Sequence, residues 1–139
     1  MVKSSYYRVL FLFGGIWNIG GAIPSWLGAI LVPDMAFASA GMSPPAVLFP
    51  YHAMYSFIIT FGIGYIIVSR DIAKNHGIVV LGIIGKTLFF IACAIAFASK
   101  EANLMVLLTG IVDILFACLF LEFLFSVKKG SVSFVTGIR

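Results

Sequence analysis

The stretch VVLGIIGKTLFFIACAIAF, residues 79–97, contains one charged side chain, Lys86, in an otherwise almost wholly apolar run. A run of this length and apolarity is typical of a helix that crosses the roughly 30 Å of hydrocarbon in a bilayer. The stretch therefore predicts a transmembrane helix. It also raises the question of what a lysine does near the middle of one.

The rest of the chain has the same character. Its 139 residues are 62% hydrophobic and 10% charged, with a mean hydropathy of +1.14, whereas soluble domains are about half apolar and a quarter charged. Four apolar segments are long enough to span a bilayer as helices: residues 6–31, 50–69, 77–98 and 103–126. We therefore expect an all-α fold, with residues 1–139 forming one integral membrane domain, an antiparallel four-helix transmembrane bundle.

The basic residues predict the orientation of this bundle. Positively charged residues are enriched in the cytoplasmic loops of membrane proteins. One side of the predicted bundle carries Lys3, Arg8, Arg70, Lys74, Lys128, Lys129 and Arg139, and the other side carries Lys100. We expect both termini to be cytoplasmic and the loop 32–49 to lie outside. Because the basic residues are explained as topology signals, we expect no nucleic acid partner.

Two opposite charges are predicted to lie at similar depth. At 1.5 Å per residue, Lys86 is about 14 Å and Asp113 about 20 Å from the cytoplasmic ends of their helices. An unpaired charge at such depth costs about 2.5 to 3.5 kcal/mol on insertion scales. We therefore expect Lys86 to pair with Asp113. Such a pair is either a structural contact that fixes helix register or a substrate or proton site.

The first segment adds Asn18 at the same depth. Asn18 lies in the middle of a stripe of mostly small residues on one helical face: Phe11, Gly14, Gly15, Asn18, Gly21, Ala22 and Ser25. Small residues allow another helix to approach closely. We expect Asn18, Lys86 and Asp113 to form one buried polar network.

The second segment carries a stripe that is either a packing surface or the wall of a pocket. The stripe consists of Tyr51, Tyr55, Ile58, Gly62, Tyr65 and Ser69, and His52 lies beside it. We expect Tyr51 and Tyr55 near the outer membrane interface and Tyr65 near the inner one, because amphipathic rings favour the headgroup level. His52 has no second metal ligand at helical spacing, so we predict an interfacial hydrogen bond, outer-side recognition or proton exchange, and no metal site.

Glu122 is nine residues beyond Asp113, which turns the two carboxyl groups to opposite faces of one helix. Cys118 and Ser126 share the face of Glu122. Three roles are open: Glu122 reaches the nearby cytoplasmic surface, pairs with Arg8, or marks a subunit interface.

Four stretches resemble the DoxX-like family of small four-helix bacterial membrane proteins: YRVLFLFGGIWNIGGAIP, GIGYIIVSRD, GIVVLGIIGKTLFF and GIVDILFACLFLEFL. Together they extend from Tyr7 to Leu124. The resemblance implies a four-helix fold and a location in the cell inner membrane. A named branch of that family is linked to quinone and sulfur-compound oxidation, but no residue here matches a defined redox site.

No nucleophile with an adjacent base is present, Cys93 and Cys118 lack the spacing of a redox pair, and no cofactor is implied. We expect a protein that binds or carries a small amphiphile, with Lys86 neutralising an anionic or carbonyl group, or a subunit of a larger membrane complex. One alternative is an enzyme acting on a lipid or quinone, with Lys86 and Asp113 as proton-transfer groups. Another is a proton-coupled transporter that works as an oligomer. The expected partners are the lipid bilayer, an amphiphilic ligand, and further copies or other membrane subunits.

Overall fold

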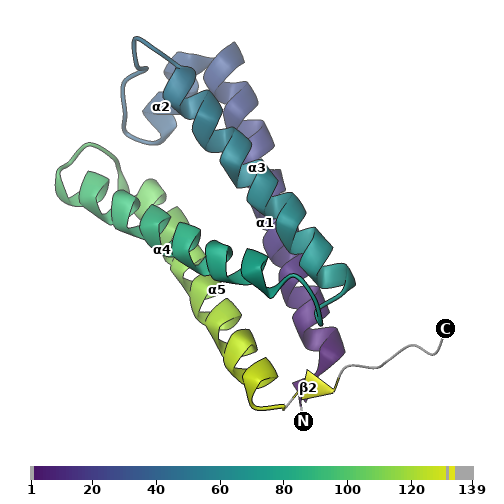
Figure 1. Cartoon of the computed structure of the whole chain (residues 1–139). Coiled ribbons are helices and arrows are strands. Elements are labelled where there is room, and N and C mark those ends of the chain that lie inside the picture. The colour runs from purple at the N-terminus through teal and green to yellow at the C-terminus, as the bar shows by residue number, and fades with distance from the viewer. Residues whose placement is uncertain (1, 131, 134–139) are drawn as a thin grey trace.

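The computed structural model describes residues 2–130 and 132–133. Within them the chain forms five helices, α1 (Ser4–Leu31), α2 (Pro33–Ser39), α3 (Phe49–Arg70), α4 (His76–Ala98) and α5 (Leu104–Lys128) (Figure 1). The strands β1 (Val2–Lys3) and β2 (Val132–Ser133) pair in parallel, so both ends of the described chain lie at one end of the molecule. The bounds of the four long helices differ by no more than two residues from the predicted apolar segments.

The four long helices, α1, α3, α4 and α5, are long and apolar enough to cross a membrane. In the most apolar 18-residue window of each, between 17% and 33% of the residues are buried inside the protein. Apolar surface of this extent is stable only against hydrocarbon or another protein. The four helices therefore indicate a multi-pass membrane protein.

The long helices form two pairs, α1 with α3 and α4 with α5, and the two helices of each pair run in opposite directions (Figure 1). Glycines set the close approach in each pair. A Cβ atom on Gly15 would lie 2.8 Å from the backbone oxygen of Gly62 in α3, and one on Gly110 would lie 2.8 Å from Cβ of Cys93 in α4. Both contacts are therefore possible only without a side chain at the glycine.

An aromatic core joins the two pairs at the end of the molecule that holds the termini. Phe11 of α1 packs on Phe120 of α5 with 4.7 Å between the ring centroids, and Tyr65 of α3 meets the same ring at 4.9 Å. One turn nearer the terminal end, Tyr7 packs edge-on against Phe123, also at 4.9 Å. All five side chains are fully buried or nearly so. We call this half of the molecule the terminal half and the other the distal half.

The connections are short and polar at the terminal end. Asp71 follows α3, accepts a hydrogen bond from the backbone N–H of Ala73 and pairs with Lys74 at 3.1 Å. The hydrogen bond from Lys74 holds the pKa of the Asp71 carboxyl below its usual value. Asn75 then takes a left-handed conformation, with φ of 61°, immediately before α4. At the distal end, the loop predicted over residues 32–49 contains the short helix α2, which begins at Pro33 because proline is well suited to a first helical turn.

Candidate functional site

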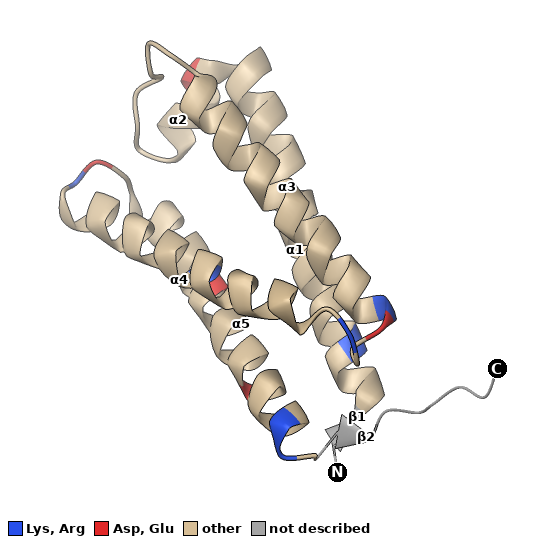
Figure 2. Cartoon of the chain, viewed as in Figure 1, with Lys and Arg blue, Asp and Glu red and all other residues tan. Residues whose placement is uncertain are grey.

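Lys86, Asp113 and Asn18 meet at the level where the two helix pairs join. The ammonium Nζ of Lys86 donates to Oδ1 of Asp113 at 2.6 Å and to Oδ1 of Asn18 at 3.1 Å. The amide Nδ2 of Asn18 donates to the backbone carbonyl of Ile58 at 3.3 Å. These residues belong to α4, α5, α1 and α3, so one hydrogen-bonded network links all four long helices. Figure 2 shows the two opposite charges side by side on α4 and α5, away from either helix end.

Burial makes this network strong and specific. The side chain of Lys86 is 3% exposed, and its ammonium also faces the rings of Tyr65 and Phe116, 5.6 and 5.1 Å from their centroids. An ammonium has three N–H donors. Two donate to Asp113 and Asn18, and the aromatic faces provide a cation–π environment for the rest of the charge. Lys86 is thus fully engaged by the protein.

Asp113 is engaged on one side only. Its side chain is 15% exposed, and Oδ1 receives the bond from Lys86. Among the described residues, every buried side-chain nitrogen or oxygen has a hydrogen-bond partner, whereas Oδ2 of Asp113 has none. Oδ2 is therefore not completely buried, although Asp113 is in the middle part of an apolar helix.

Two glycines on one face of α1 show how the helix pairs separate beyond the network. Gly21 is seven residues, or two helical turns, beyond Gly14, so both glycines face the same direction. A Cβ atom on Gly14 would touch Phe120 at 3.3 Å and Phe116 at 3.6 Å, whereas one on Gly21 would meet nothing within 4 Å. The pairs are in contact at Gly14 and apart at Gly21.

The facing side of α5 gives the same result. Phe116 is buried, and Thr109, two turns away on the same face, is exposed. Across residues 104–112 the only buried residue is Gly110, which packs on Cys93 within the α4–α5 pair. We call the surface formed by Gly21 of α1 with Thr109 and Asp113 of α5 the inter-pair surface.

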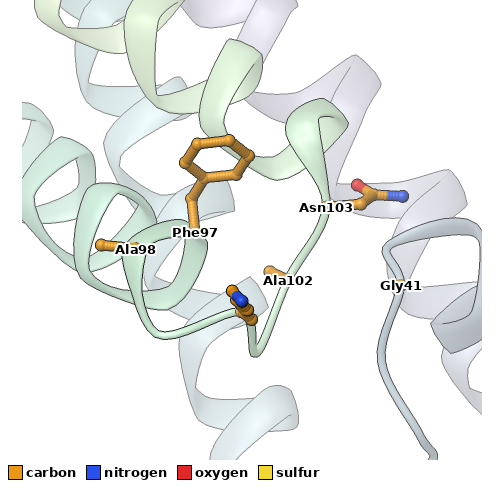
Figure 3. Close-up of a pocket in the computed structure, with 6 residues that line it drawn as sticks. Gly41, Phe97, Ala98, Ala102 and Asn103 are labelled. Atoms are coloured by element: carbon orange, nitrogen blue, oxygen red, sulfur yellow. The ribbon is translucent and has the colours of Figure 1, made fainter.

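A second contact between the pairs closes the distal end. The backbone N–H of Asn103 donates to the carbonyl of Ala40, and its side-chain Nδ2 donates to the carbonyl of Ser39, both at 2.9 Å. Figure 3 shows Asn103 next to the loop that carries Gly41, beside a hollow of about 500 Å³ that Phe97, Ala98 and Ala102 also line. The left-handed conformation of Gly41, with φ of 73°, allows this close approach. The inter-pair surface thus lies between the Lys86 network and the Asn103 contact.

The residues predicted to line a pocket are in two places. Tyr51, His52 and Tyr55 are half-buried near the distal end of the α1–α3 pair. There Nε1 of Trp26 donates to Nδ1 of His52 at 2.8 Å, and the rings of Trp26 and Tyr55 are stacked at 6.5 Å. His52 thus accepts a hydrogen bond from the indole of Trp26 and is not a member of the Lys86 network.

Tyr65 departs from its expected place at an inner membrane interface. It is 1% exposed and packs between Phe61, Phe120 and the backbone of Gly82, with its ring facing Lys86. The lack of a side chain at Gly82 provides the space for the tyrosine ring, so Tyr65 enters the core instead of pointing outward. Two members of the stripe therefore take part in the network, Ile58 through its backbone carbonyl and Tyr65 through its ring.

Glu122 is exposed on the flank of α5 and binds a residue that the sequence did not single out for it. Oε1 accepts hydrogen bonds from the hydroxyl of Tyr7 at 2.7 Å and from that of Ser126 at 3.1 Å. Among the described residues no ion pair joins it to Arg8. Glu122 and Ser126 line a hollow of about 620 Å³ with Cys118, Leu121, Phe125 and Lys129.

The described residues contain no cluster of three or more histidine, cysteine or acidic side chains that could hold a metal ion. Cys93 is buried and Cys118 is exposed, and both are free thiols. Tyr7, Phe116 and Asn103 make contacts that sequence reasoning missed. Phe116 follows Asp113 by one helical turn, which is the only local sign of its role.

No protein-family model matches the chain, and neither curated proteins nor solved structures include a significant match to it. The resemblance to DoxX-like proteins therefore stays a prediction.

Proposed function

We propose that this chain is a multi-pass protein of the cell inner membrane, with both termini in the cytoplasm, that binds a small amphiphile on its inter-pair surface. In this proposal the four long helices form an antiparallel transmembrane bundle. The bundle is closed in its terminal half by the aromatic core, and the ligand lies in its distal half.

The distribution of charge supports the orientation. Arg8, Arg70, Lys74 and Lys128 lie toward the end of the molecule that holds the termini, and Lys100 lies at the other end (Figure 2). Cytoplasmic ends of membrane helices carry the excess of lysine and arginine. The terminal half is therefore assigned to the cytoplasmic leaflet and the distal half to the outer leaflet.

The observation that carries the binding proposal is the contrast between Gly14 and Gly21. The same face of α1 is packed against α5 at Gly14 and has nothing within 4 Å at Gly21. In a membrane, an apolar helix surface gains little free energy when it packs on another helix instead of on lipid. A separation between two helix pairs is therefore stable when the hydrocarbon chains of an amphiphile fill it. The Lys86 network and the Asn103 contact bound the filled space at its two ends.

Native mass spectrometry of the protein in mild detergent tests this proposal. The wild-type protein is expected to retain an amphiphile, and Gly21→Trp is expected to lose it because the indole would occupy the inter-pair surface. Gly20→Trp is the matched control. Gly20 also has nothing within 4 Å, but it lies about 120° around the helix from Gly14 and so points away from α5.

Two results would refute the proposal. One is a wild-type protein that carries no amphiphile after extraction from its own membrane or after incubation with lipid. The other is equal retention by the Gly21→Trp and Gly20→Trp variants, which would place the bound molecule elsewhere.

A further inference from the structure

We infer that the amphiphile on the inter-pair surface is a neutral molecule with a hydroxyl group, which donates a hydrogen bond to Oδ2 of Asp113. This inference rests on the proposed function and adds the chemical class of the ligand. It differs from the expectation that Lys86 would neutralise an anionic or carbonyl group.

The hydrogen-bond donors of the network, on Lys86 and Asn18, already donate to acceptors within the protein. Lys86 donates to Asp113 and Asn18 and faces two aromatic rings, and its side chain is 3% exposed. The amide of Asn18 donates to the carbonyl of Ile58, within the α1–α3 pair. A ligand that brings only acceptors, such as a ketone or an ester, would find no donor presented to it on this surface.

The inter-pair surface instead carries two oxygens that can accept a hydrogen bond. Oδ2 of Asp113 has no partner among the described residues and is not buried. One turn away on the same helix, the Thr109 hydroxyl donates to the carbonyl of Met105 at 3.0 Å, which leaves its oxygen free to accept. Both oxygens can therefore accept a hydrogen bond from a ligand, and the charged oxygen of Asp113 is the stronger acceptor.

The depth of Asp113 makes this hydrogen bond strongly favourable. Asp113 is nine residues from Leu104 and fifteen from Lys128, which places it about 14 Å and 22 Å from the two ends of α5. Bulk water does not reach the middle of a bilayer, and an unsatisfied carboxylate oxygen there costs several kcal/mol. A hydrogen-bond donor from a bound amphiphile removes that cost.

Charge then selects a neutral donor. A carboxylate or phosphate at this position would be repelled by Asp113. An ammonium would bring a second positive charge close to Nζ of Lys86, which is 2.6 Å from the same carboxyl group. A hydroxyl group donates without adding charge, so a long-chain alcohol is the simplest ligand of the inferred class.

Competition among three probes with the same chain tests the inference. Binding of tritiated 1-hexadecanol to the purified full-length protein is measured, with competition by unlabelled 1-hexadecanol, 1-methoxyhexadecane and hexadecanoate. The alcohol should compete at least about tenfold more strongly than the methyl ether or the acid, because one hydrogen bond to a charged group is at stake.

The outcomes separate the two proposals. Competition by hexadecanoate or the ether that equals or exceeds that of the alcohol overturns the inferred ligand class and leaves amphiphile binding standing. If none of the three binds and the native protein retains no amphiphile, the proposed function itself fails, and this inference fails with it.

A folded variant without the carboxylate provides the control. Lys86→Met combined with Asp113→Leu removes both charges of the pair together. In this variant the preference for the alcohol over the methyl ether should fall well below about tenfold, because the remaining acceptor on this surface, the Thr109 hydroxyl, is uncharged. A preference of about tenfold that persists in the folded double variant would contradict the role given to Asp113.

Discussion

Lys86 is the residue at which the four long helices converge. Its ammonium binds Asp113 on α5 and Asn18 on α1, and Asn18 binds the backbone of α3. Removing one member of a buried pair leaves the other charge without compensation, whereas removing both removes the requirement. The stability of the protein should therefore depend on the pair as a unit.

We predict that Lys86→Met lowers the free energy of unfolding by about 3 to 5 kcal/mol. The double variant Lys86→Met with Asp113→Leu should recover most of this loss, as measured by unfolding in mixed detergent micelles. The exposed residue Lys100 provides the control, since Lys100→Met should change stability by less than about 0.5 kcal/mol. The two charges would not be coupled if the double variant lost as much stability as Lys86→Met alone and Asp113→Leu alone added together.

This part of the site could be predicted from the sequence because so few charges lie within the apolar segments. A lysine and an aspartate at similar depth on consecutive helices have a strong requirement for each other. The hydrogen bond between Tyr7 and Glu122 could not be predicted in this way. It depends on how α1 passes α5, and either side chain could instead have reached the headgroup region.

At the scale of helices, glycine positions determine which pairs form. Gly15 and Gly62 bring the backbones of α1 and α3 together, next to the hydrogen bond between Asn18 and Ile58. The sequence predicted that the small-residue stripe of the first segment would face another helix, and Gly14 and Gly15 do so. Gly21 belongs to the same stripe and faces open space.

We predict that Gly15→Ala destabilises the protein by about 1 to 3 kcal/mol, as overpacking of helix contacts does. The new Cβ atom would lie 2.8 Å from the Gly62 carbonyl oxygen and 2.7 Å from the side chain of Ile66. The same change at Gly20, where nothing lies within 4 Å, should be neutral or slightly stabilising, since alanine favours helix. Equal effects of the two substitutions in the same unfolding assay would argue against the α1–α3 contact described here.

At the scale of the whole molecule, the two halves differ in what fills the space between the helix pairs. Large aromatic side chains fill it in the terminal half, and the described protein leaves it open in the distal half. The sequence predicted four helices from length and apolarity alone. It could not predict this asymmetry, because residues that face lipid and residues that face another helix in a membrane are equally apolar.

The most direct test of this account is the accessibility of a spin label at position 21 in lipid bilayers. Gly21→Cys and Gly20→Cys are labelled in a background with Cys93→Ala and Cys118→Ala, and collision of each label with dissolved oxygen is measured. No amphiphile is added, because a label at position 21 would occupy the inter-pair surface as the indole of Gly21→Trp does. We predict that the label at position 21 is as accessible to oxygen as the label at position 20, since nothing lies within 4 Å of either glycine. A label at position 21 that is much less accessible than the label at position 20 would show that the two helix pairs are packed along their whole length, and would contradict the open inter-pair surface.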